Sequence, residues 1–201
     1  MPDRELGRAL LAIARSAIAD ALGLSAAHVE DTPALRQPAA TFVTLTKAGA
    51  LRGCIGSLEP VRALEADVRE NAIAAAFRDP RFRPLAVAEF EEIAIEVSVL
   101  TASERLDVTD EADLWARLRP GQDGLILEYG RHRATFLPQV WDTLPRRRDF
   151  VAALKQKAGL PGDFWSPNLV VSRYEVTKYA EGTQVDGAQV DGARDADEPA
   201  P

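Results

Sequence analysis

The residues best suited to chemistry lie together in the segment 51–58. It contains Cys54, the single cysteine of the chain, with Gly53 directly before it and Gly56 two positions after it. A free thiol has a pKa of about 8.5, so only about 3% is thiolate at pH 7, and a nucleophilic role requires a nearby positive charge. Arg52 would share a face of a regular strand with Cys54. Arg52 is therefore the candidate that activates the thiol, and its planar guanidinium suits a carboxylate or phosphate.

The same segment also has a purely structural interpretation. Free cysteine is among the most buried residue types, and buried cysteines are usually inert. Glycines inside a strand mark either a bulge or the close approach of another backbone or ligand. The spacing alone favours a structural Cys54 and leaves the nucleophile open.

A carboxylate and a hydroxyl form a second candidate group. Residues 93–100 alternate between branched apolar and other side chains, so Glu96 and Ser98 are expected on the same side of a strand. A carboxylate on such an apolar strand is exposed, paired or functional. The plainest expectation is that Glu96 pairs with an arginine, either Arg52 or Arg81.

Two further polar residues are candidates for ligand contacts. Asn71 lies on a predicted helix and would offer a side-chain amide, while Arg81 would contact an anion. The segment 79–85 that contains Arg81 also has the composition of a helix stop followed by a stiff turn, which is the structural alternative. A histidine base for Cys54 would have to be His132, which lies in a predicted hairpin and is expected to be exposed.

Composition excludes several classes of protein. The chain has 201 residues, 46% of them apolar, and a net charge of −7. Residues 181–201 hold six acids and one base, so this segment carries −5 and the remainder only −2, which argues against nucleic acid as a partner. One cysteine and two histidines form no metal-ligand set, and no cofactor-binding motif is present. The charged N-terminus and the lack of a long apolar run predict a cytoplasmic protein without a membrane span.

The pattern of elements predicts an α+β fold with a mainly antiparallel sheet and flanking helices. Strands are expected at 41–47, 51–58, 93–100 and 168–179, with a hairpin formed by 124–129 and 132–137. Helices are expected from Asp3, as the N-cap, to Gly23, from Pro60 to residue 78, over 110–118, and from Asp149 to residue 158. The predicted domain covers residues 1–180. The acidic segment 181–201, which repeats Gln-Val-Asp-Gly-Ala, is predicted to be a disordered tail.

Taken together, the motifs resemble those of a known family. Leu51-Arg52-Gly53-Cys54-Ile55-Gly56 is similar to the signature hexapeptide of the AMMECR domain family, called AmmeMemoRadiSam system protein A in bacteria and archaea. Further matching segments follow in the same order and together cover about residues 5–180: Asn71 with Asp79–Phe82, Glu96–Leu100, Thr135–Trp141, and Lys155–Leu160 with Trp165. The resemblance implies a larger and a smaller lobe with a groove between them, and partnership with a Memo-like protein and a radical SAM enzyme. It implies no settled reaction.

Two functional hypotheses follow. In the first, the protein is an enzyme or an enzyme-associated subunit in which Cys54 is the nucleophile or thiol carrier and Glu96 the acid or base. The residues expected to bind its small anionic substrate are Arg52, Gly53, Gly56, Asn71, Arg81 and Ser98. In the second, the protein is a non-catalytic module that binds a ligand or a protein, and Cys54 is structural. The association with a radical SAM enzyme favours the first hypothesis, and whether the chain is an enzyme stays open.

Overall fold

The computed structural model describes residues 4–26 and 29–182. The helices are α1 (Arg4–Ala21), α2 (Leu64–Phe77), α3 (Glu111–Arg117) and α4 (Arg147–Lys157). The strands are β1 (Pro38–Lys47), β2 (Ala50–Gly56), β3 (Arg62–Ala63), β4 (Ile93–Leu100), β5 (Glu104–Arg105), β6 (Gly124–Tyr129), β7 (His132–Phe136), β8 (Val170–Tyr174) and β9 (Val176–Ala180). Short 3-10 helices lie at Pro33–Arg36, Val87–Glu89 and Pro138–Asp142.

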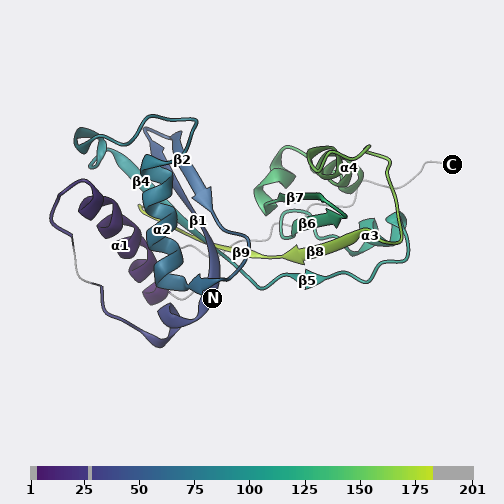
Figure 1. Cartoon of the computed structure of the whole chain (residues 1–201), viewed down its shortest axis with the longest axis horizontal. Helices are drawn as coiled ribbons and strands as arrows, with labels where there is room; N and C mark the ends of the chain where they lie inside the picture. Colours follow the sequence, from purple (N-terminus) through teal and green to yellow (C-terminus); the bar gives the residue numbers. More distant parts are fainter. Residues whose placement is uncertain (1–3, 27–28, 183–201) are drawn as a thin grey trace.

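The larger lobe is an antiparallel sheet covered by two helices on one face (Figure 1). Its strand order is β2-β1-β4-β9, and β3 pairs with the start of β1. The alternating residues of β4 behave as predicted, because Ile93, Ile95 and Val97 are buried in the core that α1 and α2 share with the sheet. Among residues 4–26 and 29–182, no helix covers the other face of this sheet, and we call it the helix-free face.

The smaller lobe contains a second antiparallel sheet of order β5-β8-β6-β7, packed with α3 and α4 (Figure 1). Its core includes Leu125 and Leu127 of the predicted hairpin, together with Phe150 of α4. Trp141 stacks on Phe150 with ring centroids 3.7 Å apart. The two sheets with their helices confirm the predicted α+β class.

The two lobes meet through a small apolar cluster. Ala40 and Leu100 of the larger lobe pack with Ile126 and Tyr174 of the smaller one. The Tyr174 hydroxyl hydrogen-bonds with Thr135 and donates to the carbonyl oxygen of residue 136. Burial raises the pKa of Tyr174 to about 12, so this phenol stays protonated and keeps these bonds at any physiological pH.

Several predicted boundaries are wrong. The helix expected from Asp149 begins at Arg147, and the strand expected over 51–58 ends at Gly56. The helix expected from Pro60 begins at Leu64, because Arg62–Ala63 extend along the start of β1 as β3. The single strand expected over 168–179 is two strands, β8 and β9, which belong to different sheets and are separated by Glu175. The chain therefore returns from the smaller lobe to the larger one at Glu175.

The predicted acidic tail falls mostly outside the described residues, since 183–201 are not among them. Glu181, at the start of that predicted segment, is part of the fold: Arg15 donates to its carboxylate at 2.7 and 2.5 Å, and its backbone N–H bonds the carbonyl of Ile95. No helix within residues 4–26 and 29–182 has the length and apolar character needed to cross a membrane.

Candidate functional site

Three of the predicted site residues lie together on the helix-free face. In the register of the larger sheet, Thr44 of β1 is opposite Cys54 on one side and Glu96 on the other. Directly opposed residues project to the same side of a sheet, so Cys54, Thr44 and Glu96 form one row across three strands. Ser98 lies on the same face of β4, two residues beyond Glu96. The apolar residues between them point the other way, toward α1 and α2.

Cys54 is half-buried, and its thiol has a polar neighbour within the row. The Thr44 hydroxyl donates to Cys54 Sγ at 3.2 Å. Each cross-strand step separates side chains by about 5 Å, so the Glu96 carboxylate is on the order of 10 Å from the thiol. A substrate lying over Thr44 would therefore reach both groups, whereas Glu96 is too far to take the proton of Cys54 directly.

Glu96 has a partner that the sequence analysis did not foresee. Its Oε1 lies 3.4 Å from Lys178 Nζ on β9 and 3.5 Å from the Ser98 hydroxyl. The expected pairing of Glu96 with Arg52 or Arg81 is wrong, because both arginines are bound to other carboxylates. The Glu96 side chain is 33% exposed, so it remains accessible on the helix-free face.

Arg52 is held by a carboxylate far away in the sequence. Its Nε and Nη2 donate to the two oxygens of Glu89, each at 3.0 Å, and this pairing lowers the pKa of Glu89 to about 2. A register shift leaves Arg52 as the extra residue of a β-bulge, which breaks the alternation expected to align it with Cys54. Its Nη1 is buried and has no hydrogen-bond partner within the described residues.

The segment after α2 binds the backbone of Cys54 at the open edge of β2. The Cys54 N–H donates to Asp79 Oδ2 at 2.9 Å, and Arg81 Nη2 donates to the Cys54 carbonyl at 3.3 Å. Arg81 also donates to Asp79 through Nε and Nη2 at 2.9 and 2.7 Å. These bonds hold the pKa of the Asp79 carboxyl far below its ordinary value, with Arg81 as the largest cause.

Both glycines of the segment are required by packing within the protein. A Cβ at Gly53 would lie 2.1 Å from the carbonyl oxygen of Ala75 in α2, which shows how closely the helix approaches β2. A Cβ at Gly56 would lie 2.3 Å from the ring of Phe42. Neither glycine has to leave room for a ligand to explain its presence.

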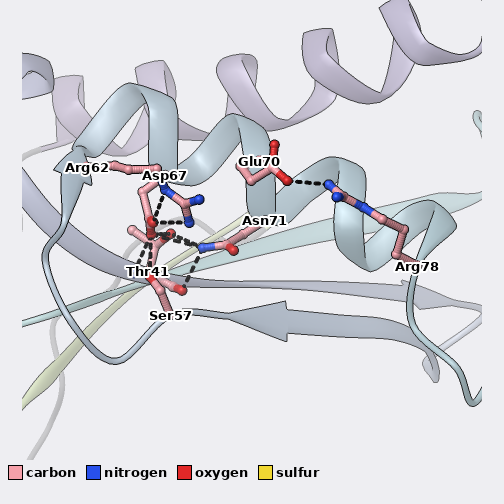
Figure 2. Close-up of polar contacts among 7 residues, drawn as sticks. All are labelled: Thr41, Ser57, Arg62, Asp67, Glu70, Asn71 and Arg78. Atoms are coloured by element: carbon pink, nitrogen blue, oxygen red, sulfur yellow. Dashed lines mark hydrogen bonds and ion pairs between the residues drawn. The ribbon is translucent and has the colours of Figure 1, made fainter.

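Asn71 lies on the opposite side of the sheet from Cys54. Its amide donates to Thr41 O at 3.0 Å and to Asp67 Oδ2 at 2.9 Å, beneath α2 (Figure 2). Asp67 is fully buried and also accepts bonds from Ser57 at 2.7 Å and from Arg62 at 2.7 Å. Asn71 therefore belongs to a buried network that joins α2 to the sheet.

Comparison with known proteins agrees with this arrangement of fold and motifs. The AMMECR1 family model matches residues 11–179, which is most of the chain. The chain belongs to the AMMECR1 family.

Two relatives match this chain over most of its length. A protein of Methanothermobacter thermautotrophicus is 43% identical over 187 residues, covering 89% of this chain and 95% of that protein. A protein of Sulfurisphaera tokodaii is 41% identical over 184 residues, covering 84% and 78%. The crystal structure of the uncharacterized protein PH0010 from Pyrococcus horikoshii matches with a TM-score of 0.79 and 33% identity, over 90% of this chain and 93% of that one.

In this AMMECR1 protein, the imidazole of His132 is engaged within the smaller lobe. His132 lies on β7, and its Nδ1 is 2.8 Å from the carbonyl oxygen of Ala158. Across the described part of the chain, no group of three or more His, Cys, Asp and Glu side chains is arranged to hold a metal ion.

Four residues that shape the candidate site were not predicted from the sequence: Thr44, Asp79, Glu89 and Lys178. Thr44 was detectable only as one of several threonines in a β-branched strand. Asp79 was noted as part of a turn, but its bond to Cys54 joins residues 25 apart. Glu89 and Lys178 lie in segments without a motif, and only the folded chain brings them to Arg52 and Glu96.

Proposed function

We propose that this AMMECR1 family member is an enzyme or an enzyme-associated subunit that acts on a small anionic substrate at the helix-free face. Cys54 is its nucleophile or thiol carrier, and Glu96 serves as acid or base toward the substrate. The observation that carries this proposal is the row Cys54–Thr44–Glu96, which lies on the sheet face that α1 and α2 leave uncovered.

The separation within the row favours distinct roles for the two groups. A substrate above Thr44 would present its electrophilic atom to Cys54 and a proton-exchanging group to Glu96. Ser98, which is bonded to Glu96 Oε1, would help to orient that carboxylate. Such an arrangement divides nucleophile and acid–base chemistry between two strands of one rigid sheet.

Charge at the site favours two cations for the anionic group of the substrate. The Lys178 side chain is 43% exposed beside Glu96, and Arg81 is 54% exposed beside Cys54. The Arg52 side chain is only 13% exposed, and its guanidinium is bound to Glu89. Arg52 therefore stabilises the local structure of β2. In this proposal Lys178 and Arg81 replace Arg52 as the groups that meet the anion.

Partnership remains a proposal that rests on the family resemblance. A Memo-like protein and a radical SAM enzyme are the proposed partners, in a cytoplasmic setting. Under this proposal the helix-free face supplies a thiol to a reaction that a partner completes.

The alternative function is a non-catalytic binding module in which Cys54 is structural. The observation that favours it is that Arg52 and Arg81 are each paired with a carboxylate, which offsets their positive charge near the thiol. It expects the glycine-containing strand β2 and the turn at 79–85 to shape a pocket for a small ligand or a partner peptide, with an inert thiol.

The test uses the fact that Cys54 is the single thiol of the chain. The rate of alkylation by iodoacetamide at pH 7 is measured on the folded protein and on the same chain unfolded in urea. We expect the folded chain to react several-fold faster, because a nucleophilic cysteine is exposed and enriched in thiolate. The Cys54→Ser variant controls for labelling elsewhere. Labelling that begins only on unfolding would refute the thiol proposal and support the binding module.

A further inference from the structure

We infer that Asp79 and Arg81 are positioning residues for Cys54: together they clamp its backbone N–H and C=O at the open edge of β2 and place two opposed charges at this residue. The inference rests on the proposed function, since it gives the clamp a role in the chemistry of Cys54. It also changes the role of Arg81 from a group that only binds substrate to one that holds the nucleophile.

The position of β2 in the sheet explains why such a clamp is needed. β2 is an edge strand, bordered by β1 on one side only. Alternate residues of an antiparallel edge strand direct both the N–H and the C=O away from the neighbouring strand, where they lack partners. The bonds of Cys54 to Asp79 and Arg81 place it at such a position. Two side chains thus occupy the place of a neighbouring strand along this one residue.

The clamp is itself held rigidly at its acidic end. The Asp79 side chain is 1% exposed, and it accepts the backbone N–H of Arg81 at 3.1 Å in addition to the guanidinium bonds. Asp79 also directly follows Arg78, the residue that caps α2, so the position of the carboxylate depends on where that helix ends. Because α2 packs closely on β2 at Gly53, one helix fixes both the strand and the clamp that holds Cys54.

The two charges of the clamp act on a thiolate with opposite sign. The Arg81 guanidinium would attract a thiolate, and the pKa of Arg81 itself is raised chiefly by its hydrogen bond with Asp79. The Asp79 carboxylate would repel the thiolate. We therefore expect loss of the Arg81 charge and loss of the Asp79 charge to change the labelling of Cys54 in opposite directions, whereas a purely structural loss would loosen β2 in the same way in both variants.

The experiment measures iodoacetamide alkylation of Cys54 in the full chain between about pH 6 and about pH 10. We expect Arg81→Gln to slow labelling several-fold at neutral pH and Asp79→Asn to accelerate it several-fold. Arg81→Lys keeps the positive charge and should restore most of the wild-type rate. The curves should converge at high pH, where every chain carries a thiolate.

Two controls separate this role from general destabilisation. Asp20→Asn breaks the exposed pair between Asp20 of α1 and Arg69 of α2, which is remote from the clamp, and should leave the labelling curve unchanged. Hydrogen exchange at the Cys54 amide reports the clamp directly and should accelerate in Asp79→Asn. If Asp79→Asn does not fold, the comparison of Arg81→Gln with Arg81→Lys decides the question.

The outcomes distinguish failure of the inference from failure of the proposed function. A reactive wild-type thiol with unchanged Arg81→Gln and Asp79→Asn rates would overturn the clamp alone. Changes of the same sign in both variants would do the same, because they would show only a loosened strand. A wild-type thiol that is inert until unfolding would overturn the proposed function, and the positioning role with it.

Discussion

The polar groups on the two faces of the larger sheet differ in burial and in the number of their hydrogen-bond partners. On the face covered by α1 and α2, Asp67 accepts six hydrogen bonds, from Thr41, Ser57, Arg62 and Asn71. On the helix-free face, Cys54 and Glu96 are partly exposed and each has few partners. A buried carboxylate is tolerated only when its bonds are satisfied, so the first face is built for stability. The second retains groups that a ligand can still reach.

The largest expected effect is on the covered face. Asp67→Ala removes the acceptor of six hydrogen bonds and leaves buried donors without partners, so we expect a loss of about 3 kcal/mol in the free energy of unfolding. Urea denaturation measures this loss. Glu70→Ala, which removes an exposed partner of Arg78 on the same helix, should cost less than about 0.5 kcal/mol. If Asp67→Ala lowered the free energy of unfolding by less than about 1 kcal/mol, the covered face would not be the one built for stability.

A second change tests whether the approach of α2 also supports the helix-free face. Gly53→Ala places a methyl group against the Ala75 carbonyl, and separating the helix from β2 should cost about 2 kcal/mol of stability. Because the strand would shift, the alkylation rate of Cys54 should change as well, even though position 53 faces the helix. An unchanged labelling rate in a destabilised variant would show that the two faces are independent.

Lowering the pH should weaken the ion pair between Glu89 and Arg52 at the β2 edge of the larger sheet. The pKa of Glu89 is lowered to about 2 in the folded chain, first by Arg52, so its contribution to stability is complete above its unfolded pKa of about 4.5. That contribution is lost as the pH falls from about 4.5 toward 2. With allowance for its 22% exposure, we expect it to be about 2 kcal/mol. Unfolding of wild type and Glu89→Gln in urea at about pH 5 and about pH 3 measures it, and an equal pH dependence of the two chains would contradict the assignment.

The smallest effect on stability belongs to the helix-free face. Thr44→Val removes the hydroxyl that donates to Cys54 Sγ but keeps the shape of the side chain, so the free energy of unfolding should fall by less than about 1 kcal/mol. Labelling of Cys54 should nevertheless slow several-fold at neutral pH, because a donor to the thiolate is lost. Thr46→Val, two residues along the same strand, is the matched control and should leave labelling unchanged. A slower rate in both variants would point to a general effect of the strand.

The sequence by itself determined the elements whose signals are local. The apolar spacing of α1, the alternation of residues 93–100 and the hairpin of β6 and β7 all depend on neighbours a few residues apart, and these predictions are confirmed. The alternation also placed Glu96 and Ser98 on one side of their strand. The family resemblance was visible in the same way, as short motifs in a fixed order.

Tertiary structure alone decided which of these groups meet. Cys54 and Glu96 share a row only because β1 lies between β2 and β4 in one register. Asn71 binds a buried carboxylate, and Arg52 is bound by Glu89. Asp79 holds the backbone of Cys54. The periodicity of the local sequence predicts none of these contacts. The division of 168–179 between two sheets has the same origin, because a β-pattern predicts an extended chain but not its neighbour. Partners across the sheet depend on register and packing, which the whole chain sets at once.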